Sequence, residues 1–310
     1  MCRKRKRGLN SIVAVLDTIA KNRLITGFAM GTLVFSCILL GGKWLLALLL
    51  LFIITASKEY ADILKNKGFL PFFKVILIVS VSMVLVSACG YGELLPLVLL
   101  FGTIGSFLAV LFRGRQPYIA NVATTILGFL IAWMPCHICL IREMGPDVSL
   151  FGISFRQGLY FLVFIFFVIL FTDIAAYYFG VKFGKHKLSP VISPKKTIEG
   201  SLAGGFCAIV AGLIIGKFIG ISLYHSFVLA LIVTVMAQLG DLSESLIKRD
   251  AGVKDSGNSL PGHGGFLDRA DSYLFSVPVA YYYIKFFILT NLTLPMVGEF
   301  IKKVFHVICG

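Results

Sequence analysis

Charged residues are scarce in this chain, and their scarcity excludes an ordinary soluble domain. Only 14% of the 310 residues are charged, whereas 58% are hydrophobic. A soluble domain carries charge on about a quarter of its residues. The apolar residues form runs that are long enough to cross a bilayer as helices. We therefore expect an all-α, polytopic integral membrane protein with about nine transmembrane helices.

Acidic residues are scarcer than basic ones. The chain has 15 Asp and Glu against 29 Lys and Arg, which gives a formal net charge of +14. Such an excess is typical of the positive-inside rule, and it also favours attraction to anionic lipids and nucleotide phosphates on the same cytoplasmic face. Nucleic-acid binding is not expected, because no soluble basic module exists to carry it.

Paired cysteines, linkers and repeats are also lacking. The seven cysteines are scattered, and Cys136 and Cys139 form a CxxC without a second pair, which disfavours a metal or redox site there. No low-complexity linker or clear internal repeat divides the chain. We predict a basic cytoplasmic N-terminus over 1–23, an N-terminal transmembrane region over 24–156 and a C-terminal transmembrane catalytic region over 157–310.

The apolar runs predict where the spans lie, and the second and fifth runs are the shortest. Non-membrane stretches are expected at 136–156, 182–200 and 248–271. The predicted spans are 24–40, 44–60, 73–90, 94–112, 118–135, 157–180, 202–220, 224–247 and 272–290.

Basic residues cluster in alternate loops if the chain has these spans. The positive-inside rule then places the N-terminus and the basic loops in the cytoplasm. Two of the expected non-membrane stretches, 182–200 and 248–271, fall on that side, which predicts a site open to the cytoplasm. The clusters lie at 3–7, 58–74, 113–115, 182–196 and 248–254.

The most polar segment of the chain is 245–271. Asp268 and Asp271 are three residues apart, so a helix places both carboxylates on one face, where they can hold a divalent cation. The Gly-rich run 261–265 before them can bring backbone N–H groups close to a phosphate. Alternatively, the two aspartates pair with Arg269 or Lys254, or favour the start of a helix.

Asp241 follows a long apolar run. If that helix continues, Asp241, Glu244 or Ser245, and Lys248 share one face, which predicts a polar stripe toward a cavity. A helix that simply leaves the membrane would carry the same charges.

The second polar segment, 173–201, is rich in lysine and contains two Ser-Pro turns. Its lysines attract anionic headgroups and nucleotide, although an ordinary cytoplasmic loop looks the same. Asp173 lies near the end of a span and is expected to face the cavity. Glu199 is expected to cap the helix or to pair with Lys195 or Lys196.

The segment 245–271 resembles the signature of the phosphatidate cytidylyltransferase (CDP-diacylglycerol synthase) family, S-x-hydrophobic-K-R-x4-K-D-x-small-x2-hydrophobic-P-x-H-G-G-hydrophobic-x-D-R-hydrophobic-D. Only Ala270 departs, being smaller than usual. The matching residues are Ser245, Lys248, Arg249, Lys254, Asp255, Gly257, Leu260, Pro261, His263, Gly264, Gly265, Phe266, Asp268, Arg269 and Asp271.

A second block resembles the same family, with Val181 where many members have Arg. The matching residues are Asp173, Ala176, Tyr177, Gly180, Gly184, Lys185, Leu188, Ser189, Pro190, Ser193, Pro194, Lys195, Lys196, Thr197, Glu199 and Gly200.

The resemblance implies transfer of CMP from CTP to phosphatidic acid, giving CDP-diacylglycerol and pyrophosphate in phospholipid biosynthesis. It also implies Mg²⁺, with a monovalent cation such as K⁺ beside it, and a homodimer in a bacterial cytoplasmic (inner) membrane, in contact with membrane lipid. The family's metal ligands fall on Asp241, Asp268 and Asp271. Catalytic roles fall on Asp241, Lys248, Arg249, Lys254, Asp255, His263, Asp268 and Asp271. Substrate binding falls on Lys185, Ser193, Lys195, Lys196, Lys254, Gly264, Gly265 and Arg269.

Two other functions fit parts of the pattern. A CTP-dependent polyprenol kinase would also need metal and basic loops, but it would release CDP instead of pyrophosphate. A transporter would carry charges deep within several spans, whereas charge here concentrates in two loops. CDP-alcohol phosphotransferases are set aside because their D-G-x2-A-R motif is absent from the sequence.

Overall fold

The computed structural model describes residues 27, 29–113, 116–150, 153–257, 259 and 264–290. The chain forms two compact units. The first combines Met1–Pro135 with Glu244–Asp271, and the second combines Cys136–Ser243 with Ser272–Gly310. The segment that carries the strongest motif therefore groups with the N-terminal helices, although residues 136–243 separate the two in the sequence.

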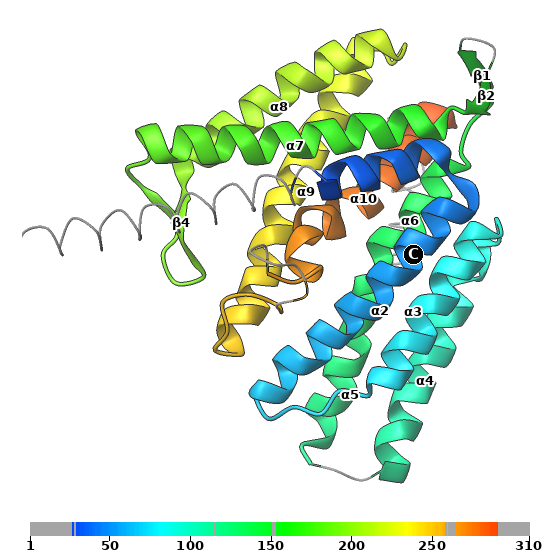
Figure 1. Ribbon diagram of the computed structural model, residues 1–310, viewed down its shortest axis with the longest axis vertical. Helices are drawn as coiled ribbons and strands as arrows, with labels where there is room; N and C mark the ends of the chain where they lie inside the picture. Colours follow the sequence, from blue (N-terminus) through cyan, green and yellow to red (C-terminus); the bar gives the residue numbers. More distant parts are fainter. Residues whose placement is uncertain are drawn as a thin grey trace, which may run out of the picture. The chain divides into compact units, whose positions relative to one another are not determined.

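The first unit is built on a layer of apolar helices, and α2, α3 and α4 lie side by side in chain order (Figure 1). The packing is close where glycine removes a side chain, because a Cβ on Gly102 would lie 2.7 Å from Val79. Tyr60 on α2 donates to the Thr124 carbonyl at 2.8 Å and joins α2 to α5. Its elements are α2 Gly42–Asn66, α3 Phe73–Ala88, η1 Gly92–Leu94, α4 Leu95–Arg113, α5 Tyr118–Leu127, η2 Gly128–Ala132 and η3 Leu267–Arg269, and α6 Trp133–Arg142 begins in it.

The second unit is dominated by the pair α7 and α8, which run side by side (Figure 1). Small residues allow the two backbones to approach, as is common between membrane helices. A Cβ on Gly204 would lie 2.8 Å from the Thr172 carbonyl oxygen. The elements are β1 Asp147–Leu150, β2 Ile153–Arg156, α7 Gly158–Phe183, β3 Lys187–Ser189, β4 Ser193–Thr197, α8 Ile198–Phe218, α9 Leu223–Asp250, α10 Asp271–Tyr283 and η4 Ile284–Leu289, and α9 continues into the first unit.

A short hairpin connects α7 to α8. Strands β3 and β4 pair antiparallel, with Lys187 opposite Thr197 and Ser189 opposite Ser193. The Thr197 side chain then accepts a hydrogen bond from the Gly200 N–H at 3.2 Å, which satisfies one of the unpaired donors at the start of α8. The lysine-rich segment is therefore an ordered ribbon that ends in a capped helix.

The membrane-protein class and its helical architecture are confirmed. Within the described residues, seven helices are long and apolar enough to cross a membrane, and Ala29–Leu40 and Phe73–Ala88 are shorter apolar helices. A total of nine spans stays a prediction. The proposed regions 1–23, 24–156 and 157–310 also stay predictions. The long helices are Gly42–Asn66, Gly92–Arg113, Tyr118–Arg142, Gly158–Phe183, Ile198–Phe218, Leu223–Asp250 and Asp271–Leu289.

One expected loop is helical at its start. The prediction of a non-membrane stretch over 136–156 is wrong for its first seven residues, because α6 runs on to Arg142. Cys136 and Cys139 lie inside this helix and are buried. His137 between them is buried as well, so this stretch packs in the interior as part of a helix instead of forming a solvent-exposed loop.

Candidate active site

Asp268 lies at the centre of the first unit's polar cluster. It is 8% exposed, on the 3-10 turn η3. Its Oδ1 accepts from Lys248 Nζ at 2.5 Å. Its Oδ2 accepts from Ser256 N at 2.8 Å, Ser256 Oγ at 2.9 Å and Gly265 N at 2.8 Å. Burial alone would raise the pKa of Asp268, but the Lys248 ammonium and the backbone N–H groups hold that pKa below its usual value.

Lys248 joins two carboxylates. It forms ion pairs with Glu244, one turn earlier on α9, and with Asp268. All three side chains are buried. Neither Glu244 oxygen accepts a hydrogen bond of good geometry from the described residues. One ammonium thus faces two buried carboxylates, an arrangement that is costly to desolvate.

This donor chemistry fits a hard cation, because carboxylate oxygens are the ligands that Mg²⁺ prefers. Asp268 and Glu244 supply such oxygens in excess of the one lysine between them. In the described parts of the chain, no three His, Cys, Asp or Glu side chains are grouped closely enough to hold a metal ion. Metal ligation by Asp241, Asp268 and Asp271 therefore stays a prediction.

Glycines allow the chain to approach Asp268. Gly264 has a φ of 79°, which an L side chain rarely adopts, and a Cβ there would lie 2.5 Å from Asp268 Oδ2. The next residue, Gly265, donates its backbone N–H to the same oxygen. Gly264 therefore makes room for a carboxylate and Gly265 donates to it in this structure, and the predicted contact of the Gly-rich run with a phosphate stays a prediction.

Sequence reasoning missed Glu59 on α2. Its carboxylate is buried and accepts hydrogen bonds from Ser259 Oγ, Phe266 N and Leu267 N. An ionisable residue in an apolar helix is a signal for function. That signal is weakened here because Lys58, Asp62 and Lys65 surround Glu59 in sequence and suggest a helix that leaves the membrane.

In the second unit, Lys196 and Asp241 form an ion pair. Lys196 is the penultimate residue of β4, and Asp241 lies on α9. The two side chains are 30% and 24% exposed, so the pair is partly accessible. The structure thus brings together a lysine predicted to bind substrate and an aspartate predicted to bind metal.

Glu199 does not pair with the lysines that were expected. Its carboxylate accepts from the backbone N–H groups of Lys185 at 3.0 Å and His186 at 3.2 Å, and it lies 2.6 Å from His186 Nδ1. The prediction of a partner in Lys195 or Lys196 is wrong, because Glu199 starts α8 beside the chain that leaves α7. Its role is to fix that chain.

The remaining predicted residues are placed as follows. Lys254, Asp255 and Arg269 are exposed, as are Lys185 and Lys195 in the second unit. His263 lies outside the described residues. Arg249 donates to the Val253 carbonyl at 2.9 Å. Asp271 begins α10 and is half-buried, Ser193 begins β4, and Asp173 lies exposed on α7.

Lys254 gives a direct test of the phosphate-binding prediction. Lys254→Met should raise the KM for CTP by about tenfold, since a charge-assisted hydrogen bond to phosphate contributes roughly 1.5–3 kcal/mol. Lys58→Met, which removes another exposed lysine, is the control and should leave the KM unchanged. Steady-state kinetics at varied CTP decide the question, and an unchanged KM in Lys254→Met would count against the assignment.

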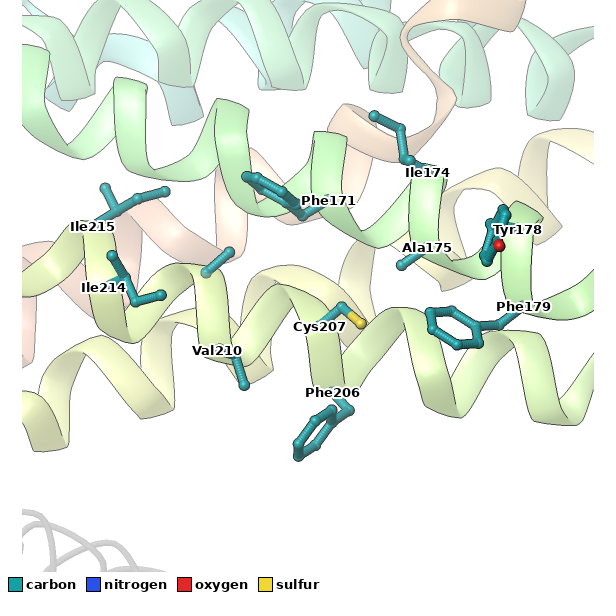
Figure 2. Close-up of a pocket in the computed structure, with 11 residues that line it drawn as sticks. Phe171, Ile174, Ala175, Tyr178, Phe179, Phe206, Cys207, Val210, Ile214 and Ile215 are labelled. Atoms are coloured by element: carbon teal, nitrogen blue, oxygen red, sulfur yellow. The ribbon is translucent and has the colours of Figure 1, made fainter.

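An apolar cavity of about 520 Å³ lies between α7 and α8 (Figure 2). Its walls include Phe171, Ile174, Phe206 and Ile214, and none of the predicted site residues lines it. A triphosphate would lose its hydration there without gaining partners. The cavity is therefore a hydrocarbon surface, separate from the polar clusters.

These features first define a class, an integral membrane protein with buried charged side chains beside a glycine-rich turn. Burying charge in such a protein is costly, so the charges are expected to serve a functional site. Sequence comparison then gives the family. A profile of the Cytidylyltransferase family matches residues 21–287, and the chain belongs to that family. The resemblance drawn from the two motifs is confirmed.

Individual relatives agree with this assignment. The chain is 35% identical over 283 residues to a Synechocystis protein named phosphatidate cytidylyltransferase, and the match covers 84% of this chain and 95% of that protein. Proteins of the same name from Staphylococcus saprophyticus and Staphylococcus aureus are 42% and 43% identical over 157 and 152 residues. Those matches cover 48% of this chain and 58% of each relative.

Proposed function

We propose that this protein is a phosphatidate cytidylyltransferase, a nucleotidyltransferase that converts CTP and phosphatidic acid into CDP-diacylglycerol and pyrophosphate. The match with the Synechocystis protein, which covers 95% of that relative, carries the proposal. The two polar motifs and the buried cluster around Asp268 support it, because both suit phosphate chemistry at a membrane.

The reaction needs no covalent intermediate with a protein side chain, because one substrate attacks the other directly. A phosphate oxygen of phosphatidic acid attacks the α-phosphorus of CTP, and the bond to the leaving pyrophosphate oxygen breaks in line. The protein must align two anions and neutralise the charge on the leaving group. We assign the alignment to the basic residues Lys185, Lys195, Lys196, Arg249, Lys254 and Arg269.

Mg²⁺ would neutralise phosphate charge in this reaction, with a monovalent cation such as K⁺ beside it. We propose Asp241, Asp268 and Asp271 as the residues that hold the cations. Lys248, Asp255 and His263 complete the proposed catalytic group, and Ser193, Gly264 and Gly265 the substrate-binding group. The hard oxygen donors around Lys248 support a cation at the first unit's cluster.

We further propose a homodimer in a bacterial cytoplasmic membrane, with the site open to the cytoplasm. The alternation of basic loops supports this orientation. Phosphatidic acid would keep its acyl chains in the bilayer while its headgroup meets CTP at the cytoplasmic surface.

One assay tests the proposal. Detergent-purified protein is incubated with phosphatidic acid, CTP and Mg²⁺, and both CDP-diacylglycerol and pyrophosphate are measured. We expect equal amounts of the two products, and neither when phosphatidic acid or CTP is omitted. Release of CDP with a phosphorylated alcohol, when polyprenol is supplied instead, would favour a kinase. Absence of any nucleotide chemistry would reject the enzyme assignment.

A further inference from the structure

Glu59 on α2 connects that helix to residues on both sides of the Gly-rich run 261–265. The side chain is 6% exposed on α2. Its Oε1 accepts from Ser259 Oγ at 2.6 Å and from Phe266 N at 3.1 Å. Its Oε2 accepts from Leu267 N at 3.0 Å, and Ser256 Oγ lies 3.3 Å from the same oxygen. Three protein donors therefore meet one buried carboxylate, and the single proton of the Ser256 hydroxyl is shared with Asp268. These contacts offset the cost of burying Glu59.

Glu59 and Asp268 divide a single run of backbone donors. Three consecutive N–H groups point into the cluster, and Gly265 donates to Asp268, whereas Phe266 and Leu267 donate to Glu59. The Ser256 hydroxyl lies between the two carboxylates, 2.9 Å from Asp268 and 3.3 Å from Glu59. The turn cannot rotate to release one carboxylate without also changing its bonds to the other.

The contact with Glu59 explains why positions 257 and 265 are both glycine. A Cβ on Gly257 would lie 3.0 Å from Glu59 Oε1, which is tighter than ordinary van der Waals contact. A Cβ on Gly265 would overlap the same carboxylate and Ser256 Oγ. The chain on both sides of 260–263 is therefore shaped to fit Glu59.

We propose that Glu59 is a positioning residue for the reaction: it fixes the turn that carries Gly265 and Asp268, so that a helix of the N-terminal half takes part in building the active site. Glu59 acts through Ser256, Phe266 and Leu267 and through their neighbour Asp268. This inference rests on the proposed function, because Asp268 is the residue whose cation binding Glu59 would support.

The test compares Glu59→Gln with Asp62→Asn. The control removes an acidic charge three residues further along α2, where Asp62 is exposed and forms an ion pair with Lys65. In Glu59→Gln one carboxylate oxygen becomes an NH₂ group, which cannot accept a hydrogen bond from the Phe266 or Leu267 N–H. The turn that holds these residues should therefore be less firmly fixed. We expect the Mg²⁺ concentration for half-maximal activity to rise by about 10–100-fold, as for residues that orient metal ligands, and Asp62→Asn to match the wild type.

A second readout needs neither metal nor substrate. Trypsin can cut after Lys254 and Arg269, which are exposed on either side of the turn. In the absence of Mg²⁺ and CTP, native Glu59→Gln should be cut there about tenfold faster than the wild type or Asp62→Asn, because local opening controls such cleavage. A residue that served only global stability would lower the unfolding temperature without a selective change at these two positions.

The outcomes separate the two hypotheses. An inactive wild type would overturn the proposed function, whereas an active wild type with unchanged Mg²⁺ requirement and cleavage in Glu59→Gln would overturn the positioning role alone. If Glu59→Gln does not fold, Ser259→Ala removes only one donor to Glu59. It should then shift both readouts in the same direction by a smaller factor, and no shift would reject the proposal.

Discussion

Asp268→Asn is expected to lower turnover by at least about 100-fold, the scale of losing a group that stabilises developing charge at a reaction centre. The substitution removes the negative charge proposed to bind Mg²⁺. It also leaves Lys248 with Glu244 as its remaining buried partner, since Lys248 pairs with these two carboxylates. Product formation from CTP and phosphatidic acid at saturating Mg²⁺ measures the effect.

A control separates chemistry from folding. Asp250→Asn removes a carboxylate that is 64% exposed and pairs with Lys67, so activity should stay at the wild-type level. Mg²⁺ should raise the thermal unfolding temperature of the wild type and of Asp250→Asn, but not of Asp268→Asn. A folded Asp268→Asn protein with wild-type turnover would remove Asp268 from both the metal site and the catalytic group.

Lys248→Met is expected to give the largest loss of stability. It leaves Glu244 and Asp268, both less than 10% exposed, without the ammonium that lies between them. Removing one partner of a buried ion pair costs about 3–5 kcal/mol, because the remaining charge is uncompensated. Thermal unfolding of the purified protein in detergent should show a clearly lower midpoint.

The same cluster predicts a rescue. Adding Glu244→Gln to Lys248→Met removes one of the two facing carboxylates, so the double variant should be more stable than Lys248→Met alone. The two substitutions should be non-additive by about 0.5–3 kcal/mol, as for residues in contact. Additive losses would mean that the ion pair between Glu244 and Lys248 contributes nothing to stability.

The sequence predicted the local features of the fold well. Apolar runs located the long helices, and charge spacing placed Asp241 and Lys248 on one helix, α9. The motif identified Asp268 and Lys248, which the structure brings within 2.5 Å of each other. These features depend on periodicity and on residues that are close in the chain, which a sequence displays directly.

The long-range contacts were beyond sequence reasoning. Glu59 and Leu267 are 208 residues apart, and no periodicity links them. Glu199 was expected to cap its helix or to pair with Lys195 or Lys196, yet it bonds to Lys185 and His186 across the hairpin. Only the path of the chain decides which of several nearby donors a carboxylate meets.

The distance in sequence between Glu59 and its donors has a consequence for biogenesis. Ser259 is synthesised 200 residues after Glu59, which at about 5–20 residues per second takes roughly 10–40 s. During that interval α2 has left the ribosome while the Glu59 carboxylate has none of its later hydrogen-bond donors. Glu59 on this early helix therefore lacks these donors until the last fifth of the polypeptide has been made, and chains truncated before residue 267 cannot complete this contact.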